Sequence, residues 1–479
     1  MTAAPAEPLT ADKTALAGRW HLAGSPAFSS ALAARLTSAG AVVSRDGEPG
    51  GDADQWIFLH GLEPAPSPEE ADSRVRACFR DLRAFARDHG GKPGRAVIVL
   101  DTGGDFGLAT DPGERAAIGA IAGLAKTAAR EWPAVRTTVL DIGRRQPADA
   151  AEVILREISS TGSELEMGAA PGGARTTPRL AAMGSAGPSA GRLQPGGVWL
   201  VSGGARGVTA LCLRSVARRS RQRFVILGRT PIEAAESAAE QTAATEAELY
   251  AVIRTESEAR GETLSPAQMR ARVARIRDRR DARDNCERLR ALGSEVRYIA
   301  ADIGDATAVA RAAAEARAAW GPISGIIHAA GHLADKLLRD QTDEQFDAVY
   351  RTKVGGLRAL LAATAEDPLD QLCVFSSVAA RAGNPGQGAY AAANEALNKI
   401  CQAESRRRAG RCRVRSINWG PWDGGMVTAA LKAHFAARGV PLISPEAGAE
   451  CFADLIASAP ETVECVVGAG TGLPRALFP

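Results

Sequence analysis

Four polar side chains in the second half of the chain have the chemistry to move a proton onto a carbonyl oxygen. They are Lys353, Ser377, Tyr390 and Asn394. A phenol with a pKa of about 10 exchanges protons poorly at neutral pH unless a cation lowers that pKa, and Lys353 can supply the cation or relay a proton through water. Ser377 can hydrogen-bond a substrate oxygen on which negative charge develops. Asn394 lies four residues after Tyr390, on the same face of a predicted helix, and can hold a water and the lysine.

Each of these residues alone has an ordinary explanation, because a tyrosine on a helix usually belongs to the core and a serine after a strand usually caps a helix. Their order along the chain argues for chemistry. Ser377 ends a predicted strand, and Tyr390 follows a Gly/Pro-rich loop. Lys353 lies on a helix that begins at Thr342 with a capping-box pattern. The set therefore predicts a proton-transfer site.

A glycine-rich turn precedes these residues and is typical of a phosphate site. It follows an apolar strand pattern and opens a helical pattern, which favours a dinucleotide site over a plain strand–helix turn. Gly203 permits the tight turn, and Gly207 lets the backbone approach a phosphate at the helix N-terminus. Thr209 stands where a third glycine is usual. The residues predicted to bind the cofactor here are Ser202, Gly203, Gly204, Ala205, Arg206, Gly207 and Val208.

The end of the next predicted strand indicates which cofactor is bound. A site for NAD usually has an acidic residue there, whereas this chain has Gly228 and Arg229. A guanidinium suits a 2′-phosphate, so we predict NADPH rather than NADH. Asp302, followed by Ile303, is placed to touch the adenine. The fourth strand ends in residues that let the cofactor pass close, and these are His328, Ala329, Ala330 and Gly331.

Apolar strand patterns alternate with helical patterns through two long stretches of the chain. The second stretch, 197–479, contains seven strand patterns, and each of the first six precedes a helix, which predicts a doubly wound parallel sheet. The first stretch, 19–160, contains three strand patterns. The predicted strands are 56–62, 95–101 and 136–142 in the first stretch, and 197–203, 224–229, 296–302, 325–331, 371–377, 414–420 and 461–468 in the second.

Three further segments complete the predicted organisation. Residues 1–18 form an N-terminal tail, and 161–196, rich in Gly, Ala, Ser and Pro, form a connector with one short strand near 176–183. Residues 231–292 exceed what one crossover helix needs and predict an inserted helical hairpin. Its acidic and basic arms fit either a solvated helix pair or a docking surface for a partner.

Composition limits the classes of function. The chain has 479 residues, of which 45% are hydrophobic and 24% charged, with a formal net charge of +3. This charge does not argue for nucleic acid, and no apolar run reaches the length of a membrane span. The six histidines lack ligand spacing, so no metal site is predicted. The N-terminus lacks a signal-peptide pattern, and we expect a cytoplasmic protein.

The second stretch resembles the short-chain dehydrogenases/reductases, and within them the ketoreductase domains of polyketide synthases. The usual Tyr-x-x-x-Lys is replaced by Tyr390-Ala-Ala-Ala-Asn394, with Lys353 upstream, which is the exchanged arrangement of those ketoreductases. VSGGARGVT, ILGRTP, the charged insertion and INWGPWDGGMV (417–427) together resemble iterative type I synthases, including polyunsaturated-fatty-acid synthases. The resemblance implies two Rossmann-like subdomains. The first, 19–160, is degenerate, since its turn at Gly24 has a single glycine.

The resemblance also implies the reaction. We expect NADPH-dependent reduction of a β-ketoacyl thioester, presented by an acyl carrier protein alongside other synthase domains. The chain keeps Leu333 and Asp335 of a Leu-Asp-Asp motif and has Ala382 where the opposing stereochemical type has Trp, which implies a (3R)-hydroxyacyl product. A helix at 425–438 is expected to close over the substrate. Pro421 is further assigned to the cofactor, and Gln387, Trp419, Trp422 and Met426 to the substrate side.

Three alternatives remain at this point. A nucleotide-sugar epimerase or dehydratase would keep Tyr-x-x-x-Lys, which this chain lacks. A catalytically silent ketoreductase-like scaffold is disfavoured by the intact group of four residues. Another short-chain dehydrogenase acting on a free ketone would use the same group.

Overall fold

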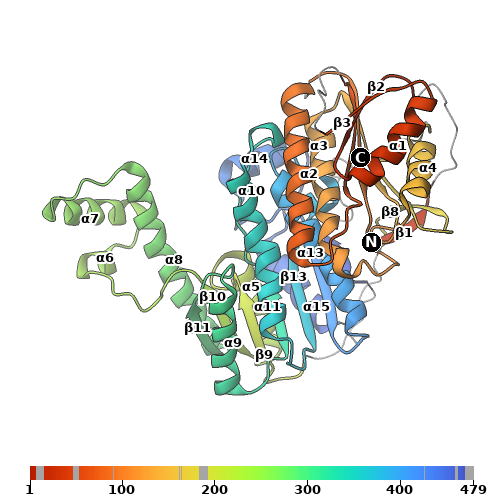
Figure 1. Ribbon diagram of the computed structural model, residues 1–479. Helices are drawn as coiled ribbons and strands as arrows, with labels where there is room; N and C mark the ends of the chain where they lie inside the picture. The colour runs from red at the N-terminus through yellow and green to blue at the C-terminus, as the bar shows by residue number, and fades with distance from the viewer. Residues whose placement is uncertain are drawn as a thin grey trace.

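The computed structural model consists of two α/β units and a helical arm (Figure 1). We call the unit around the eight-stranded sheet the first unit and the unit around the seven-stranded sheet the second unit. The arm projects from the side of the second unit (Figure 1). The structure describes residues 1–6, 16–46, 53–89, 91–160, 162, 164–182, 193–425, 427–458 and 462–469.

The second unit has the doubly wound parallel sheet that the sequence predicts. Its strand order is β11-β10-β9-β12-β13-β14-β15, so the winding reverses between β9 and β12. Ligands of such sheets bind outside the carboxyl ends of the strands at this reversal. The strands are β9 (Val198–Ser202), β10 (Arg223–Gly228), β11 (Glu295–Ala300), β12 (Gly325–His328), β13 (Gln371–Ser377), β14 (Arg413–Trp419) and β15 (Glu464–Val467).

Helices cover both faces of this sheet, which explains why its strands are apolar throughout. Val198 and Leu200 belong to one hydrophobic core, and Trp199 and Val201 belong to the other, as the two-residue period of a strand requires. The helices are α5 (Gly207–Arg219), α9 (Ala306–Trp320), α10 (Asp343–Tyr350), α11 (Gly356–Ala363), α12 (Val378–Ala382), α13 (Gly388–Arg407), α14 (Ala429–Ala437) and α15 (Pro445–Ala457), with the 3-10 turn η3 (Leu338–Asp340) and the π-helical turn η4 (Arg351–Gly355).

The first unit has strand order β1-β8-β7-β6-β5-β4-β2-β3. Strands β2 to β7 run parallel, whereas β8 is antiparallel to both β7 and β1. Its elements are β1 (Thr2–Pro5), β2 (Arg19–Ala23), α1 (Pro26–Ser38), β3 (Val42–Arg45), β4 (Gln55–Gly61), α2 (Pro68–His89), β5 (Gly94–Leu100), the 3-10 helix η2 (Gly113–Gly119), α3 (Ala120–Glu131), β6 (Val135–Asp141), α4 (Pro147–Ile158), β7 (Glu166–Ala169) and β8 (Arg175–Arg179).

Two predicted boundaries of the first unit are corrected. Thr2–Pro5 is not a tail but strand β1, which pairs with β8. The expected connector 161–196 contributes two strands to the sheet, β7 as well as the single strand predicted near 176–183. β1 and β7 have four residues each and contain no β-branched residue apart from Thr2, so pairing with neighbouring strands rather than propensity forms them.

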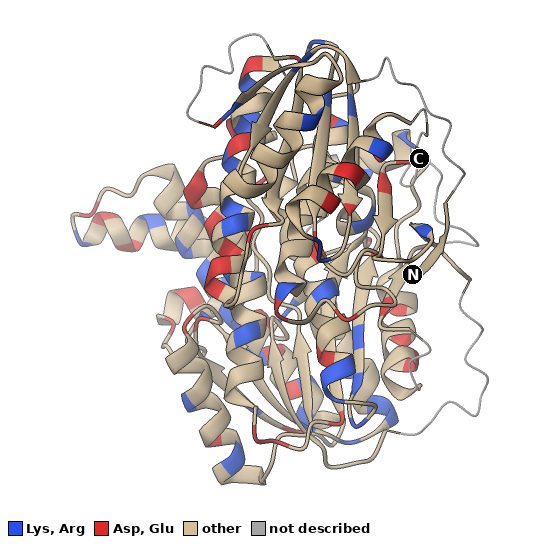
Figure 2. Ribbon diagram, turned by 45° about the vertical axis from the view of Figure 1, so that its right-hand side comes forward, with Lys and Arg blue, Asp and Glu red and all other residues tan. Residues whose placement is uncertain are grey.

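The arm is the predicted insertion. It contains α6 (Ala238–Thr242), α7 (Glu246–Ala259) and the N-terminal part of α8 (Pro266–Ala291), three helices where a hairpin was expected. A small apolar core joins α7 and α8 through Leu249, Ile253, Val273 and Ile276. The opposite charges pair inside the arm, with Arg280 Nη2 2.8 Å from Glu236 Oε2. This pairing favours the solvated helix group over the docking surface; Figure 2 shows the two charges interleaved along the arm.

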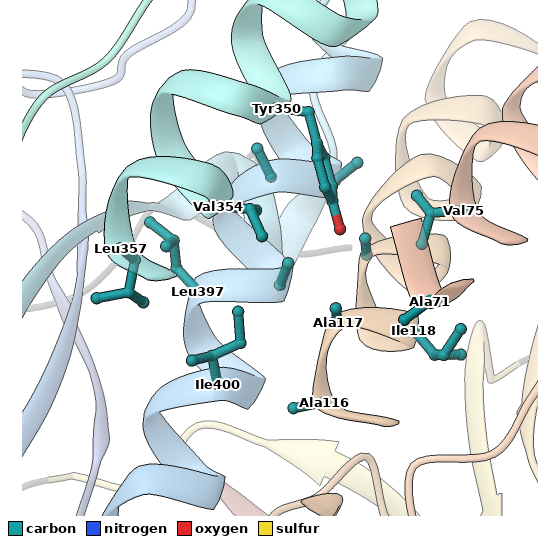
Figure 3. Packing of buried hydrophobic residues seen from close by; sticks show 14 of the residues in the cluster. Ala71, Val75, Ala116, Ala117, Ile118, Tyr350, Val354, Leu357, Leu397 and Ile400 are labelled. Carbon is teal, nitrogen blue, oxygen red and sulfur yellow. The ribbon is translucent and has the colours of Figure 1, made fainter. Parts of the chain in front are cut away.

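The two units share one hydrophobic core. Figure 3 shows Val75 of α2 and Ile118 of η2 facing Val354, Leu397 and Ile400 of the second unit. Helix α3 also meets α13 directly. A Cβ at Gly123 would lie 2.5 Å from the Ala391 carbonyl oxygen, so only glycine allows this approach. The first unit therefore lies against the helix that carries Tyr390 and Asn394.

Candidate active site

The four residues predicted to transfer protons lie together at the carboxyl edge of the second sheet. Ser377 ends β13 and caps α12, its Oγ accepting a hydrogen bond from the Ala379 N–H at 3.1 Å. Tyr390 and Asn394 lie on the first two turns of α13. Lys353 lies in the π-helical turn η4 between α10 and α11, a geometry that is frequent at functional sites.

Lys353 is buried and points toward Tyr390. Its Nζ donates to the Phe375 carbonyl at 2.9 Å and lies 5.5 Å from the centre of the Tyr390 ring. Burial lowers the pKa of Lys353 from 10.5 to about 7, because desolvation disfavours the charged ammonium. An amine with this pKa exchanges protons readily at neutral pH.

Tyr390 interacts with each of the other three side chains. Burial raises the pKa of its phenol, while hydrogen bonding from Asn394 and Ser377 acts in the opposite direction, and the negative charge of Asp335 raises it further. Asn394 Nδ2 donates to the Tyr390 carbonyl at 2.8 Å. Asn394 Oδ1 is buried and meets no donor within the described part of the chain, so it offers a free acceptor beside the phenol.

The glycine-rich turn fits a dinucleotide phosphate. Gly203 has φ +74°, and a Cβ there would lie 2.7 Å from the Ala330 nitrogen, so the turn packs directly against the segment after β12. Gly207 opens α5 with φ +63°, and no described atom lies within 4 Å of a Cβ there. No described side chain caps this helix, which leaves its first N–H groups available to an anion. Val208 lies against Gly425, 3.2 Å from the Cβ position of that glycine.

Ser202 and His328, which the sequence assigns to the cofactor site, have side chains that contact each other. Both are fully buried, and Ser202 Oγ lies 2.7 Å from His328 Nδ1. His328 Nε2 lies 2.8 Å from the Lys353 carbonyl, so this nitrogen carries the proton and Nδ1 accepts from the serine. Burial lowers the pKa of His328 to about 3 and keeps the ring neutral. The pair connects the glycine-rich turn to the turn that carries Lys353.

The predicted adenine and 2′-phosphate residues lie around the end of β10 and β11. Arg229 is exposed just after Gly228, and Tyr298 covers Gly228 while its hydroxyl donates to the Thr230 carbonyl at 2.7 Å. Asp302 is exposed and its Oδ1 accepts from the Gly304 N–H at 2.9 Å, whereas Ile303 is buried.

The insertion also reaches this edge, which the sequence did not predict. Asn285 Nδ2 of α8 donates to the Gly204 carbonyl at 3.0 Å. Asp278 Oδ1, about two turns earlier on the helix, lies 2.5 Å from Arg206 Nη1. Burial raises the pKa of Asp278, while the charges of Arg206 and Arg229 lower it. The charges of α8 were visible in the sequence, but their partners stand far away along the chain.

The predicted substrate side is partly corrected. Asp335 is exposed, Leu333 is half-buried, and Gln387 Nε2 donates to Asp335 Oδ2 at 3.0 Å. Trp419 and Trp422 instead belong to the hydrophobic core, because their rings pack on each other and Trp422 fills the space beside Gly448 of α15.

The remaining predicted residues lie between the two tryptophans and in the segment that follows them. The Pro421 carbonyl accepts from the Ile443 N–H at 2.8 Å, and Met426 lies outside the described residues. The helix expected at 425–438 is α14, which begins at Ala429 after Thr428 caps it.

Two negative findings concern the described residues. They contain no cluster of His, Cys, Asp and Glu that could hold a metal ion. Within the same ranges, no helix combines the length and apolar composition needed to cross a bilayer.

The chain is similar in sequence to known proteins. Residues 197–424 match the family model of the KR domain. The polyunsaturated fatty acid synthase of Thraustochytrium sp. has a subunit that is 35% identical over 382 residues, which are 77% of this chain and 13% of that protein. The mycocerosic acid synthase-like polyketide synthase of Mycobacterium tuberculosis is 39% identical over 175 residues, 36% of this chain and 8% of that protein.

The solved structures share the two-unit fold. The first ketoreductase of the tylosin polyketide synthase superposes with a TM-score of 0.71 at 24% identity, covering 98% of this chain and 91% of that chain. This similarity establishes the fold. The chain spans 13% and 8% of the two synthases named above, so their complete activities are not those of this chain alone.

Proposed function

Because residues 197–424 form a ketoreductase domain of the kind found in type I polyketide synthases, we propose that this chain reduces a β-ketoacyl thioester to the β-hydroxyacyl thioester with NADPH. The substrate is carried by an acyl carrier protein. The observation that carries the proposal is the approach of Lys353, Ser377 and Tyr390 at the carboxyl edge of the sheet, beside an uncapped glycine-rich helix start.

The residues of the second unit suit a phosphorylated dinucleotide. The first N–H groups of α5 would bind the pyrophosphate, and Arg206 and Arg229 would bind the 2′-phosphate, since a guanidinium forms charge-assisted bonds with phosphate. A reduced nicotinamide, when bound, supplies a hydride for the carbonyl carbon.

The protein's own groups supply the proton. Tyr390 donates its hydroxyl proton to the carbonyl oxygen as negative charge develops there, and Ser377 hydrogen-bonds the same oxygen. Lys353 returns a proton to Tyr390, which its pKa of about 7 permits at neutral pH. Asn394 presents its free Oδ1 to the relay and holds the first turn of α13 through the Tyr390 carbonyl.

The proposed product is the (3R)-alcohol. Asp335 and Gln387 are hydrogen-bonded to each other close to Tyr390, and the segment from Val378 to Ala389 contains no tryptophan that would close this side. Chiral chromatography of the alcohol made from a 3-ketoacyl thioester tests this assignment. A predominantly (3S) alcohol contradicts it.

The central experiment is turnover of short β-ketoacyl thioesters with NADPH and NADH side by side. We expect NADPH oxidation that depends on the thioester, and a lower kcat/KM with NADH. Faster reduction of a simple ketone of equal length would favour a free-ketone dehydrogenase. Absence of turnover together with no change in NADPH fluorescence on binding would support a silent scaffold.

A further inference from the structure

Glu131, the last residue of α3 in the first unit, contacts two loops of the second unit at once. Its Oε1 accepts a hydrogen bond from the Gly386 N–H at 2.9 Å, and its Oε2 accepts from the Leu338 N–H at 2.8 Å. Gly386 lies in the loop before α13, which we call the tyrosine loop (383–387). Leu338 is the first residue of η3 and directly follows the loop after β12; we call residues 329–338 the substrate loop, which contains Asp335. One carboxylate thus connects the two segments that flank Tyr390.

The two loops also bond to each other beside Glu131. The Lys336 N–H donates to the Gly386 carbonyl at 2.9 Å, and Gln387 Nε2 donates to Asp335 Oδ2 at 3.0 Å. Gly386 is therefore bonded to the substrate loop through its carbonyl and to Glu131 through its N–H. The Glu131 carboxylate therefore lies against both loops at the point where they bond to each other.

Helix α3 holds that carboxylate in a fixed place. Gly123 packs on the backbone of α13, and Arg130 Nε donates to the Ala382 carbonyl at 3.1 Å. A Cβ at Gly383 would lie 2.3 Å from the Lys126 carbonyl oxygen, so the tyrosine loop runs directly over α3. The backbone of α3 that carries Glu131 is therefore fixed against the shared core, which is closely packed.

We propose that Glu131 is a positioning residue for the ketone. The first unit uses it to hold the substrate loop and the tyrosine loop at one separation, so that the ketone presents a single face to the reacting groups. This inference rests on the proposed function for its substrate. The contacts that carry it do not depend on that function.

Glu131→Gln tests the contacts without using activity. The amide keeps one acceptor oxygen and places an NH2 group against the other N–H, so one loop loses its bond. Amide hydrogen exchange at 335–341 or 383–388 should become about 10- to 100-fold faster, the factor by which one bond to a charged group changes an opening equilibrium. Glu131→Asp keeps both acceptors on a shorter side chain and should give a smaller increase.

Arg76→Gln is the matched control. It removes an ion pair of 2.8 Å between Arg76 of α2 and Asp347 of α10, which joins the same two units through residues outside both loops. Its exchange in the two loops should equal that of the wild type. Unchanged exchange in Glu131→Gln, or equal acceleration in both variants, would overturn the positioning of the loops.

Kinetics and product analysis test the consequence. With a β-ketoacyl thioester, Glu131→Gln should raise KM about 3- to 10-fold with a smaller change in kcat, because the acceptor geometry and not the proton donor is altered. The minor enantiomer should increase severalfold, and Glu131→Asp should restore part of the selectivity. Unchanged enantiomer composition despite opened loops would overturn the inference. No turnover by the wild type would instead contradict the proposed function, and the exchange result would stand.

Discussion

Two turns occupy the same topological place in the two units, and they differ in what their backbone N–H groups bind. In the second unit, the turn between β9 and α5 has no side-chain cap within the described residues, and the space at Gly207 is open. In the first unit, the turn between β2 and α1 donates from Gly24 N–H to Asp46 at 2.6 Å and from Ser25 N–H to Glu63 at 2.8 Å. The chain's own carboxylates take the donors that a phosphate would need.

Other polar groups of the first unit are also bonded within the chain. We call the carboxyl edges of the sheets in the first and second units the first edge and the second edge. Buried Asp141 accepts from the Thr102 N–H, the Thr102 hydroxyl and the Phe106 N–H. Arg115 donates to the carbonyls of Gly61 and Glu63 and pairs with Asp101 at 3.0 Å. In the first unit, carboxylates of the chain thus accept from backbone N–H groups that would otherwise be available to an anion, and we expect this unit to bind no nucleotide.

We propose that catalysis takes place only at the second edge. The Tyr390→Phe variant tests this proposal most directly. Without its hydroxyl, residue 390 cannot donate a proton to the ketone, and general acid catalysis contributes roughly 10²–10⁴-fold. We expect kcat with a β-ketoacyl thioester to fall by that factor while NADPH still binds. Tyr250→Phe, the same change in the arm, is the control and should retain activity. A Tyr390→Phe enzyme with wild-type turnover would refute the assignment.

The second prediction concerns which nucleotide is bound and how many molecules of it each chain binds. Arg229→Ala should raise the NADPH Kd by about 10- to 100-fold, the contribution of a bond to a charged group, and leave NADH binding nearly unchanged. Isothermal calorimetry should give one NADPH per chain for the wild type. Two NADPH per chain would show that the first edge also binds a nucleotide. An equal loss of affinity for NADPH and NADH would indicate that Arg229 has a structural role.

The same contrast explains what the sequence could predict. The second sheet is predictable because its strands are continuous apolar runs between glycines, and Tyr390 and Asn394 share a helix face by their spacing alone. The sequence does not state toward which side a residue at a strand end points. His328 and Trp419 were therefore predicted to face the ligand, although both are buried in the structure.

Residues that act across long sequence separations were also missed. Glu131 bonds to residues 207 and 255 positions away, and Asp278 bonds to the glycine-rich turn from within the insertion. On α2, Arg76, Arg80, Arg83 and Arg87 share a helix face and reach the α10 region of the second unit. Their spacing was visible in the sequence, but their partners were not.

The third prediction concerns the pH dependence of the reduction rate, which we attribute to Lys353 at the second edge. Burial lowers its pKa to about 7, so the ammonium loses its proton as pH rises through 7. One pH unit higher, about one tenth of the molecules keep the ammonium, and we expect the reduction rate to fall accordingly. Rate measurements between pH 6 and pH 9, at about saturating substrate, test this expectation.

Stability should change with the opposite sign over the same range. An unfolded lysine keeps its proton up to a pKa of about 10.5, so between pH 7 and that value the unfolded state binds more protons than the folded state. The Lys353 contribution therefore stabilises the fold as pH rises, while activity falls. Lys353→Met should abolish both pH dependences. A rate that increases through pH 8 would contradict the proton relay.

The smallest expected effect is a change in NADPH affinity, caused by a carboxylate at the second edge. Asp278 of α8 pairs with the Arg206 side chain, whereas Asp46 and Glu63 in the first unit take backbone N–H groups. Pairing with a side chain leaves the helix start open but places a negative charge where the 2′-phosphate should bind. Arg206 must then divide its donors between the carboxylate and the phosphate.

Asp278→Asn should therefore tighten NADPH binding. It removes the repulsion between carboxylate and phosphate and frees Arg206, and at a solvent-screened separation of several ångströms this changes Kd by about 2- to 5-fold. NADH, which lacks the phosphate, should bind as before, and the gain should shrink as salt increases. Asp284→Asn is the matched control on the same helix, since Asp284 pairs with Arg288 of α8 at 2.7 Å. If Asp278→Asn weakens NADPH binding instead, the carboxylate orients Arg206 toward the phosphate, and the anion at this edge assists the ligand rather than competing with it.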